Sequence, residues 1–355
     1  MLDKLNATEA RFRELEERIA DPGVVTDAAA YTALMKEYRR LEPLAVALRT
    51  FKRTSRELED AKLLADTADD KEIKALATEE IKALTERLSA LEAELKILLL
   101  PRDENDDKNV IVEIRAGAGG EEAALFAAVL YRMYTMYAET AGFKTSRMSQ
   151  NETELGGFRE IVFMVAGDGA YSRFKFESGV HRVQRVPVTE SQGRIQTSTV
   201  TVAVLPEAEA VDVEINPADI IMESCKSSGA GGQHVNKTES AVRLTHKPTG
   251  IVVECQEERS QFKNRDKALK MLYAKLFDIK KTARDNEIAS TRRTQVGTGD
   301  RSERIRTYNY PQGRLTDHRI GLTLYSLEKI LNGNVGDVID ALISADTALK
   351  LQQET

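Results

Sequence analysis

The chain has 355 residues, of which 41% are hydrophobic and 30% are charged, and its formal net charge is −6. This length exceeds what one hydrophobic core usually organises, so two to four domains are expected. No stretch approaches 18 apolar residues, and the start of the chain resembles neither a secretory signal nor a transit peptide. The two cysteines, Cys225 and Cys255, lack the spacing of a disulfide framework or a zinc site. We therefore expect a soluble cytoplasmic protein without a membrane partner or a bound metal.

The charge is distributed unevenly along the chain. Residues 223–320 contain 20 Lys and Arg against 12 Asp and Glu, whereas residues 1–100 contain 17 against 21. A basic segment of this kind is typical of a part that enters an RNA-walled site, while acidic parts face solvent or protein.

The first hundred residues are expected to be helical. A helix-packing seam with steps of three and four residues is formed by Ile81, Leu84, Leu88, Leu91, Leu95 and Leu98. Thr26 or Asp27 is placed to cap an earlier helix. Because Pro22, Pro43 and the acidic stretch 66–70 interrupt the pattern, we predict a self-contained antiparallel bundle and not one long coiled coil.

A second domain is predicted after the polar linker at residues 101–108. Residues 110–114 read as a strand, followed by a glycine turn and an apolar helix that runs to about Tyr137. Strand, glycine turn and helix also suggest a dinucleotide site, but the third glycine of that fingerprint would fall at Glu122. Carboxylates at a helix start repel a pyrophosphate and interact favourably with the helix dipole. The pattern therefore favours an acidic helix N-terminus.

Two further strands, at residues 180–186 and 199–205, flank a predicted exposed loop at residues 187–194. Pro187 stiffens the entry to this loop. Short polar side chains and the cations of Arg182, Arg185 and Arg194 accompany it. Reading single-stranded RNA needs this mixture, because hydrogen bonds to base edges give identity and cations give affinity.

A third, small α/β domain is predicted around a glycine-rich loop. Strands are expected at residues 220–224, 241–245 and 251–256, and a basic helix from Arg265 to about Arg284. The loop between the first two strands reads Ser-Ser-Gly-Ala-Gly-Gly-Gln-His-Val-Asn-Lys from Ser227 to Lys237. Its glycines allow close approach of another molecule to the main chain, and Gln233 can hydrogen-bond but cannot act as a general base.

The segment after this helix is rich in arginine and tyrosine. Its cations and rings are Arg292, Arg293, Arg301, Arg304, Arg306, Arg314, Arg319, Tyr308, Tyr310 and His318. We interpret them as partners for RNA phosphates and exposed bases. Residues 321–351 are expected to form two short helices that pack on the second domain.

The loop sequence Ser-Gly-Ala-Gly-Gly-Gln-His-Val-Asn-Lys resembles the signature of class I peptide chain release factors. Pro187-Val188-Thr189 resembles the Pro-x-Thr tripeptide of the bacterial members that read the stop codons UAA and UAG. The resemblance extends from about Asn109 to Leu327. It implies a partner, the ribosome, with its rRNA, an mRNA stop codon in the A site and a P-site peptidyl-tRNA.

The resemblance also implies codon contacts. Gly119 and Glu122 would face the first base, and Thr189 the first two. Gln184 and Thr197 would read the third base, where a hydroxyl that can donate or accept tolerates adenine and guanine. The family usually has His where this chain has Gln196, so we expect a modest loss of stacking without a change of codon choice.

For hydrolysis of the peptidyl-tRNA ester, the resemblance points to Gly231, Gly232 and Gln233. Our hypothesis is that the glycines let the Gln233 N–H face the developing negative charge, while the side chain shapes a pocket for water. The ribosome would supply the rest, so the free protein should not be an enzyme by itself. The resemblance further implies N5-methylation of Gln233 by a glutamine methyltransferase. The sequence has no phosphate-binding loop of the Gly-x-x-x-x-Gly-Lys-[Ser/Thr] type, so we expect no GTP hydrolysis. We also expect a monomer without a cofactor.

The predicted fold is therefore a multidomain α+β protein. Its parts are a helical bundle at 1–100, a codon-recognition α/β domain at 108–210, a small α/β domain carrying the glycine loop at 211–302, and a return segment with C-terminal helices at 303–355, packed on the central domain. Two alternatives stay open at this point. One is a codon-independent ribosome-rescue hydrolase, which would share the glycine loop but lack the 187–197 reading loop. The other is an RNA-binding or assembly protein without hydrolytic function.

Overall fold

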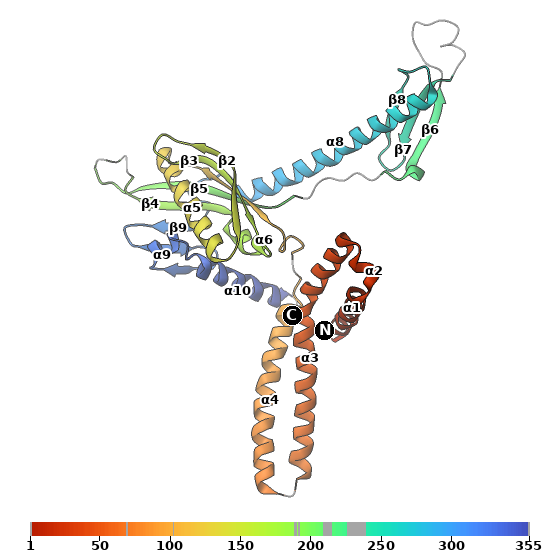
Figure 1. The fold of residues 1–355 in the computed structure, drawn as a ribbon. Helices are drawn as coiled ribbons and strands as arrows, with labels where there is room; N and C mark the ends of the chain where they lie inside the picture. The colour runs from red at the N-terminus through yellow and green to blue at the C-terminus, as the bar shows by residue number, and fades with distance from the viewer. Residues whose placement is uncertain are drawn as a thin grey trace. The chain divides into compact units, whose positions relative to one another are not determined.

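The computed structural model describes residues 2–68, 70–101, 103–187, 190, 192–208, 215–225 and 239–353. The chain divides into two compact units, one formed by residues 1–103 with 341–355 and the other by residues 104–340. Helices and strands are mixed, as the sequence predicted (Figure 1). The boundaries of the four predicted domains stay a prediction.

The first unit is built from helices. They are α1 (Leu2–Ala20), α2 (Pro22–Val25), α3 (Ala28–Thr67) and α4 (Lys71–Leu98), followed by the end of α10. The predicted seam on α4 packs along α3, with Leu84 and Leu95 buried. Asp27 precedes α3, and its Oδ1 accepts a hydrogen bond of 3.1 Å from the Ala30 N–H, as a capping residue does.

Pro43 was expected to interrupt the helical pattern, but the helix continues through it. The proline lies inside the 40-residue helix α3. A proline there removes one backbone hydrogen bond and crowds the preceding turn. The residues that follow, Leu44, Ala45 and Leu48, are all buried. Since most helix stability in proteins comes from packing, this apolar face keeps the helix continuous through the proline.

The second unit contains an eight-stranded sheet (Figure 1). Its strands are β1 (Val110–Ala116), β2 (Lys144–Glu152), β3 (Phe158–Ala166), β4 (Gly179–Arg185), β5 (Gln196–Pro206), β9 (Arg304–Asn309), β10 (Arg314–Asp317) and β11 (Leu322–Leu324). The order is β11-β10-β9-β4-β5-β1-β3-β2, and only the β4–β9 pairing among these described strands is parallel. Helix α5 (Glu121–Thr140) packs on β1, β3 and β5, and the short α6 (Ala170–Phe174) lies before β4.

The return segment corrects one prediction, because part of it is core and not RNA-facing surface. Arg306 and Tyr308 on β9 have no exposed surface. The Arg306 guanidinium donates to both carboxylate oxygens of Glu177, at 2.6 and 2.8 Å, and to Asp317 at 3.1 Å. Burial is the largest influence on Arg306 and opposes its charge, but Glu177, Tyr308 and Tyr134 together outweigh burial and raise the pKa of Arg306. These side chains tie β9 to the centre of the sheet and cannot meet RNA.

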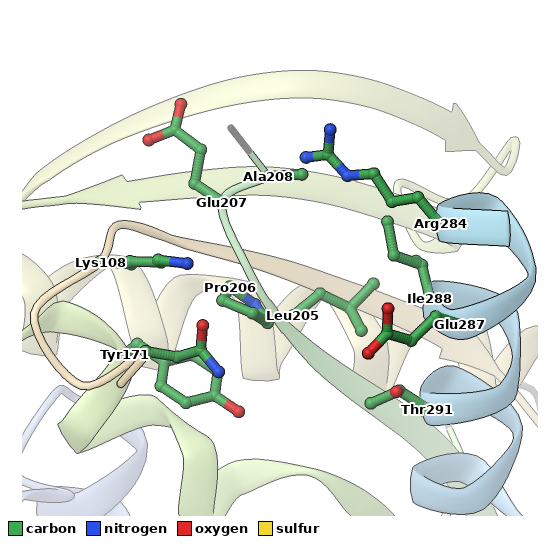
Figure 2. A pocket seen from close by; sticks show the side chains of 11 residues that line it. Lys108, Tyr171, Leu205, Pro206, Glu207, Ala208, Arg284, Glu287, Ile288 and Thr291 are labelled. Carbon is green, nitrogen blue, oxygen red and sulfur yellow. The ribbon is translucent and has the colours of Figure 1, made fainter. Parts of the chain in front are cut away.

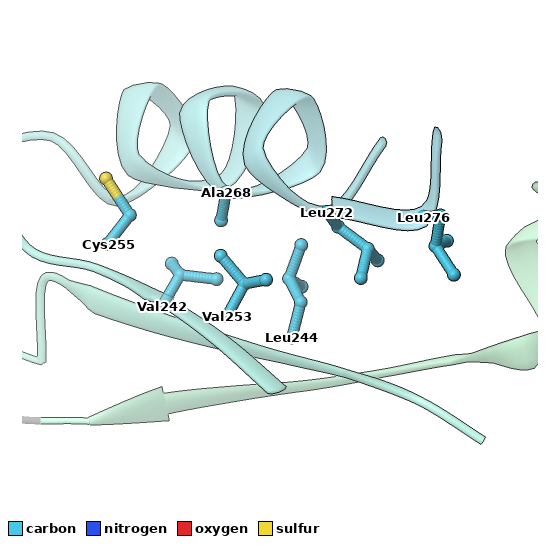
Figure 3. Packing of buried hydrophobic residues seen from close by; sticks show 7 residues of the cluster. All are labelled: Val242, Leu244, Val253, Cys255, Ala268, Leu272 and Leu276. Carbon is cyan, nitrogen blue, oxygen red and sulfur yellow. The ribbon is translucent and has the colours of Figure 1, made fainter. Parts of the chain in front are cut away.

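A three-stranded sheet forms a separate small core with one helix. Its order is β6-β7-β8, with β6 at Ile220–Cys225, β7 at Ala241–His246 and β8 at Ile251–Cys255. Val242, Leu244, Val253 and Cys255 pack against Ala268, Leu272 and Leu276 of helix α8 (Figure 3). We call β6, β7, β8 and the part of α8 up to Leu276 the three-stranded domain.

Helix α8 is longer than predicted and runs from Gln261 to Val296. Its C-terminal part contacts the eight-stranded sheet. Gln295 accepts from the Val204 N–H and donates to the Val204 carbonyl, each at 2.8 Å, and Arg292 forms an ion pair with Glu113. The expectation that Arg292 meets RNA phosphates is therefore wrong in this structure, because Glu113 neutralises it.

The last two helices are α9 (Leu327–Leu331) and α10 (Gly336–Gln353), separated by a turn at residues 332–335. Helix α9 packs on α5, and Arg132 of α5 donates to the Asn332 side chain at 2.9 Å. Packing of this segment on the central domain was predicted. None of the helices among the described residues is long and apolar enough to cross a membrane.

Candidate functional site

Gln184 and Thr197 occupy directly opposite positions on the antiparallel strands β4 and β5. Residues paired in this way have Cβ atoms about 5 Å apart, so one small ligand can meet both side chains. The Gln184 Oε1 accepts a hydrogen bond of 3.2 Å from Asn309 on β9, which fixes the orientation of its amide. The two residues predicted to act on one base therefore do lie together.

The N-terminal tip of α5 is fastened to β5 beside this pair. The backbone of Gly117 donates to the Thr199 carbonyl at 2.9 Å, and the Thr199 N–H donates to the Ala118 carbonyl at 2.7 Å. The Thr199 hydroxyl accepts from the Ala118 N–H at 2.9 Å and donates to the Gly299 carbonyl at 3.1 Å. Thr199 thus connects three segments of the chain.

Gly119 is the residue where the tip touches β5 most closely. Its φ of +134° favours glycine, and a Cβ there would lie 2.3 Å from the Ser198 Oγ. Gly120 also has a positive φ, of +60°, but a Cβ on it would meet nothing within 4 Å. The tip is therefore closed on the side of Ser198 and open at Gly120.

Glu122 is almost completely buried just behind the tip. One of its carboxylate oxygens, Oε1, is paired with Arg185 on β4, and the Arg185 guanidinium lies 5.2 Å from the centre of the Tyr310 ring. Burial is the largest influence on Arg185 and opposes its charge, but the hydrogen bond and the charge of Glu122, together with Tyr310, outweigh burial and raise the pKa of Arg185. The second oxygen, Oε2, is buried without a hydrogen-bond partner within the described residues.

Gln196 begins β5 and is exposed. Its Nε2 donates to the Glu190 carboxylate at 2.8 Å, and the other oxygen of Glu190 accepts from the Gln192 N–H at 3.0 Å. Pro187 is buried, and its carbonyl accepts a hydrogen bond of 3.1 Å from the Glu190 N–H. Glu190 therefore links the start of the loop to its end.

The six predicted codon residues that the structure describes gather at one end of β4 and β5. We call this set the platform; it consists of Gly119, Glu122, Gln184, Pro187, Gln196 and Thr197. The other five predicted site residues lie outside the described residues; they are Val188, Thr189, Gly231, Gly232 and Gln233.

Sequence reasoning missed the residues that support the platform. Thr199 and Glu190 were not singled out, and Arg185 was interpreted as a phosphate partner although it is paired with Glu122. A basic residue among strand positions gives no sign of an acidic partner 63 residues earlier in the chain. Threonine in a Val-rich strand is equally easy to read as a simple strand former.

The glycine-rich segment connects two neighbouring strands of the three-stranded domain. Cys225 ends β6, Ala241 begins β7, and the two residues are paired in the antiparallel register. The strands therefore bring the two ends of the segment close together. Cys225 and Ala241, which flank the segment in the sequence, therefore lie at the same end of the sheet.

A cavity of about 470 Å³ lies between the end of β5 and the middle of α8 (Figure 2). Its lining includes Lys108 and Arg284 as well as Glu207 and Glu287, so the charges of both signs are balanced. It contains none of the predicted site residues. Nothing in this lining favours one class of ligand.

Two family models match the chain. The PCRF domain matches residues 8–202, which include the platform, and the RF-1 domain matches residues 209–319, which include the glycine-rich segment. The chain belongs to the peptide chain release factor family. Its relatives include peptide chain release factor 1 of Caldicellulosiruptor saccharolyticus, which is 59% identical over 97% of this chain and 97% of its own length.

Other release factors match over almost the whole chain. Peptide chain release factor 1 of Acetivibrio thermocellus is 57% identical over 99% of this chain and 98% of its own length, and that of Clostridium novyi is 58% identical over 99% of both. A solved structure, RF2 of Thermus thermophilus, is 33% identical, covers 95% of this chain and 93% of its own, and has a TM-score of 0.47. Release factor membership supports termination of translation and gives no support to the rescue alternative.

Proposed function

We propose that this release factor reads UAA and UAG in the ribosomal A site and triggers hydrolysis of the peptidyl-tRNA ester. The observation that carries the proposal is the platform, in which the tip of α5 and the facing pair Gln184 and Thr197 meet at one end of the sheet. The adjacent loop carries the Pro187-Val188-Thr189 tripeptide, which resembles that of the UAA- and UAG-reading members.

The first base would meet the tip of α5. The first N–H groups of a helix have no partner within the helix, and the dipole favours electron-rich atoms there. The uracil carbonyls are such atoms, and the open space at Gly120 would let them approach the backbone. Glu122, paired with Arg185 behind this tip, would hold the tip in place. Thr189 would contact the first and second bases.

The third base would meet Gln184 and Thr197. A threonine hydroxyl can donate to the guanine O6 or accept from the adenine N6 amino group, so one side chain serves both purines. Gln184 has its carbonyl oxygen bound to Asn309, which leaves the NH2 group of its amide to donate to an acceptor such as purine N7. Such a pair accepts UAA and UAG alike.

The ester would be hydrolysed at the tip of the glycine-rich segment. Gly231 and Gly232 would allow the backbone to turn the Gln233 N–H toward the oxyanion of the tetrahedral intermediate. One such donor typically contributes about 10²- to 10³-fold to the rate. The Gln233 side chain would position water without exchanging a proton. Methylation at N5 by a glutamine methyltransferase would reduce its donors from two to one and so bias the amide toward a single orientation.

Release rates on the three stop codons test codon reading. The wild-type factor should release peptide from ribosomes programmed with UAA and UAG and fail on UGA. Thr197→Val removes the hydroxyl at constant shape, and kcat/KM should fall about 10- to 100-fold on both codons. Thr145→Val, an exposed threonine on the far edge strand β2, is the matched control and should leave both rates unchanged. Strong release on UGA by the wild type would refute the assignment.

A glycine-to-alanine pair tests hydrolysis. Gly232→Ala should lower the rate of ester hydrolysis by 100-fold or more, on the order of one oxyanion donor, while the ribosome is still bound. Gly250→Ala introduces the same methyl group in the turn between β7 and β8, where a Cβ meets nothing within 4 Å. It should cost only local backbone strain and retain release. Full activity of Gly232→Ala would remove this mechanism.

A further inference from the structure

Three arginines of the eight-stranded sheet have no acidic partner among the described residues. They are Arg182 on β4, Arg304 on β9 and Arg314 on β10. Each is partly buried, and its Nε is buried without a hydrogen-bond partner that the structure describes. Other arginines near them are each paired with a carboxylate, namely Arg185, Arg292 and Arg306. The three arginines therefore stand apart from the ion pairs that hold the sheet together.

The strand register puts the three side chains on one face of the sheet. Cross-strand partners share a face, and successive residues along a strand alternate between faces. Arg304 is paired with Val180, two positions before Arg182 on β4. Arg314 is paired with the residue of β9 that also faces Gln184, two positions after Arg182. Neighbours of this kind lie within reach of long side chains.

This face is also the one that carries the third-base pair of the platform. Tyr308 contacts Phe126 of α5 from the opposite face, with ring centres 5.2 Å apart. Gln184 and Thr197 lie on the same side as the arginines, and Arg182 is only two residues, about 7 Å, from Gln184 along β4. The arginines therefore flank the place proposed for the third base.

The three positive charges are close enough to act on their surroundings together. Burial lowers the pKa of Arg182, and the charge of Arg304 lowers it further. Burial also lowers the pKa of His318, and all three arginines add to this effect against the opposing charge of Asp317. His318 is hydrogen-bonded to the Thr307 hydroxyl at 2.8 Å, directly across from Arg182. Like charges gathered without a counter-charge are unfavourable, and a bound anion removes the repulsion.

We propose that Arg182, Arg304 and Arg314 form a binding site for a phosphate group of RNA beside the third codon base. The proposal rests on the codon reading assigned above to Gln184 and Thr197, and it adds a contact to the backbone outside the base edges. Guanidinium groups bind phosphate oxygens through parallel N–H donors and keep their charge at any physiological pH. An RNA strand whose base meets Gln184 brings backbone phosphates to this face. One phosphate there compensates the charges that the free protein leaves uncompensated.

A purely structural role of the arginines predicts a different result. Their stems could serve only to cover the sheet, and their loss would then lower stability without an effect on RNA binding. If they form an anion site, removal of one like charge should leave the midpoint of urea unfolding unchanged or raise it. The loss should then appear in RNA binding and in its dependence on salt, because each phosphate contact releases condensed counterions.

The experiment measures equilibrium binding of labelled full-length factor to ribosomes programmed with UAA. The P site carries deacylated tRNA, so no ester is hydrolysed, and salt is varied from about 0.05 to 0.2 M. Arg182→Gln and Arg314→Gln each remove one charge from the site. Arg159→Gln is the matched control, since it removes an exposed charge from β3, which is separated from β4 by β5 and β1.

Both site variants should bind about 10-fold more weakly at intermediate salt. The slope of log affinity against log salt should become shallower by about 0.7–0.9, as expected for one lost phosphate contact, whereas Arg159→Gln should keep the wild-type slope. Wild-type binding by both site variants would overturn the proposal, as would an equal change of slope in Arg159→Gln. An ion pair with a protein carboxylate releases no condensed counterions. Weaker binding with an unchanged slope would therefore assign the arginines to a protein partner and also overturn it.

An mRNA that ends at the stop codon distinguishes the two sources of such a phosphate. If the phosphate belongs to mRNA beyond the codon, the site variants and the wild type should bind this shortened mRNA complex equally. If it belongs to rRNA, the difference should persist on both mRNAs, so either result supports the site. Peptide release on UAA tests the proposed function separately. A factor that releases on UAA while its site variants bind normally refutes only this inference, whereas a wild type without release refutes the proposed function.

Discussion

The eight-stranded sheet and the three-stranded domain hold their functional segments by different means. In the eight-stranded sheet and the turn before β4, Glu177, His181, Arg306 and Asp317 are all fully buried and bound to one another or to neighbouring tyrosines. The three-stranded domain has a small apolar core and a single fully buried amide among its described residues. The contrast indicates that buried charges contribute to holding the first sheet together, whereas the described part of the second domain relies on apolar packing.

The largest expected effect comes from breaking the buried charge cluster. Arg306→Leu leaves Glu177 in the interior without its cation, while Asp317 keeps only Arg319, and the free energy of unfolding should fall by about 3–5 kcal/mol. Arg301→Leu removes an exposed arginine just before β9. It should change the free energy of unfolding by less than about 0.5 kcal/mol. Denaturant titration of both variants measures the difference. A small effect of Arg306→Leu would mean that the cluster does not hold the sheet together.

A second effect concerns pH. Burial, with help from the charge of Arg306, lowers the pKa of His181 from its ordinary value of 6.5 to about 4. Below pH 6.5 the unfolded chain therefore binds a proton that the folded chain refuses. The free energy of unfolding should fall by about 1.4 kcal/mol per pH unit between pH 6.5 and 4, to a total of about 3 kcal/mol.

Comparison with His181→Gln isolates this contribution. The variant loses the hydrogen bond to Tyr308, so it starts less stable, but its stability should be flatter between pH 6.5 and about 4.5. Below about pH 4.5, both proteins should lose stability in parallel. Burial would raise the pKa of Glu177, but Arg306 outweighs burial and lowers it, so Glu177 resists protonation in the folded state. Identical slopes in the two proteins above pH 4.5 would show that His181 is not held neutral by the fold.

The smallest expected effect tests the fastening of the α5 tip. Thr199→Val keeps the shape of the side chain but leaves the Ala118 N–H and the Gly299 carbonyl without their partner. The free energy of unfolding should fall by about 1–2 kcal/mol. Release on UAA should weaken through a higher half-saturating concentration, because the tip belongs to the platform and not to the hydrolytic segment. A change in the maximal release rate alone would contradict this assignment, because it would link Thr199 to ester hydrolysis and not to codon reading.

Much of the fold was predictable where one face of an element is apolar. Residues 110–114 are rich in Val and Ile and residues 199–205 in Val and Thr, and both were predicted as strands, as were the strands of the three-stranded domain. Residues 144–152 are exposed throughout and polar except for Met148, so strand β2 has no hydrophobic alternation to reveal it. The C-terminal part of α8 likewise has few apolar residues to mark a helix, so the helix was predicted to end too early in the chain.

The candidate site could also be predicted only in part from the sequence. The predicted codon residues came from motif resemblance, and their gathering at one end of the sheet follows from a strand register that no local pattern states. The basic return segment was misread because the partner of Arg306 is 129 residues away in the chain. A charged side chain looks the same in sequence whether it meets solvent, RNA or a buried carboxylate, and only the fold distinguishes these cases.

Helix α8 packs in the three-stranded domain and also contacts the eight-stranded sheet without a break. This continuity limits which changes of chain length the helix can accept. It carries Asn264 near one end and Gln295 near the other, in 36 residues that span about 54 Å. Because each residue adds about 100° of rotation and 1.5 Å of rise, one inserted residue between Leu276 and Arg284 would turn the three-stranded domain by more than a quarter of a circle. Homologous chains should therefore tolerate substitutions along this stretch far more readily than insertions or deletions.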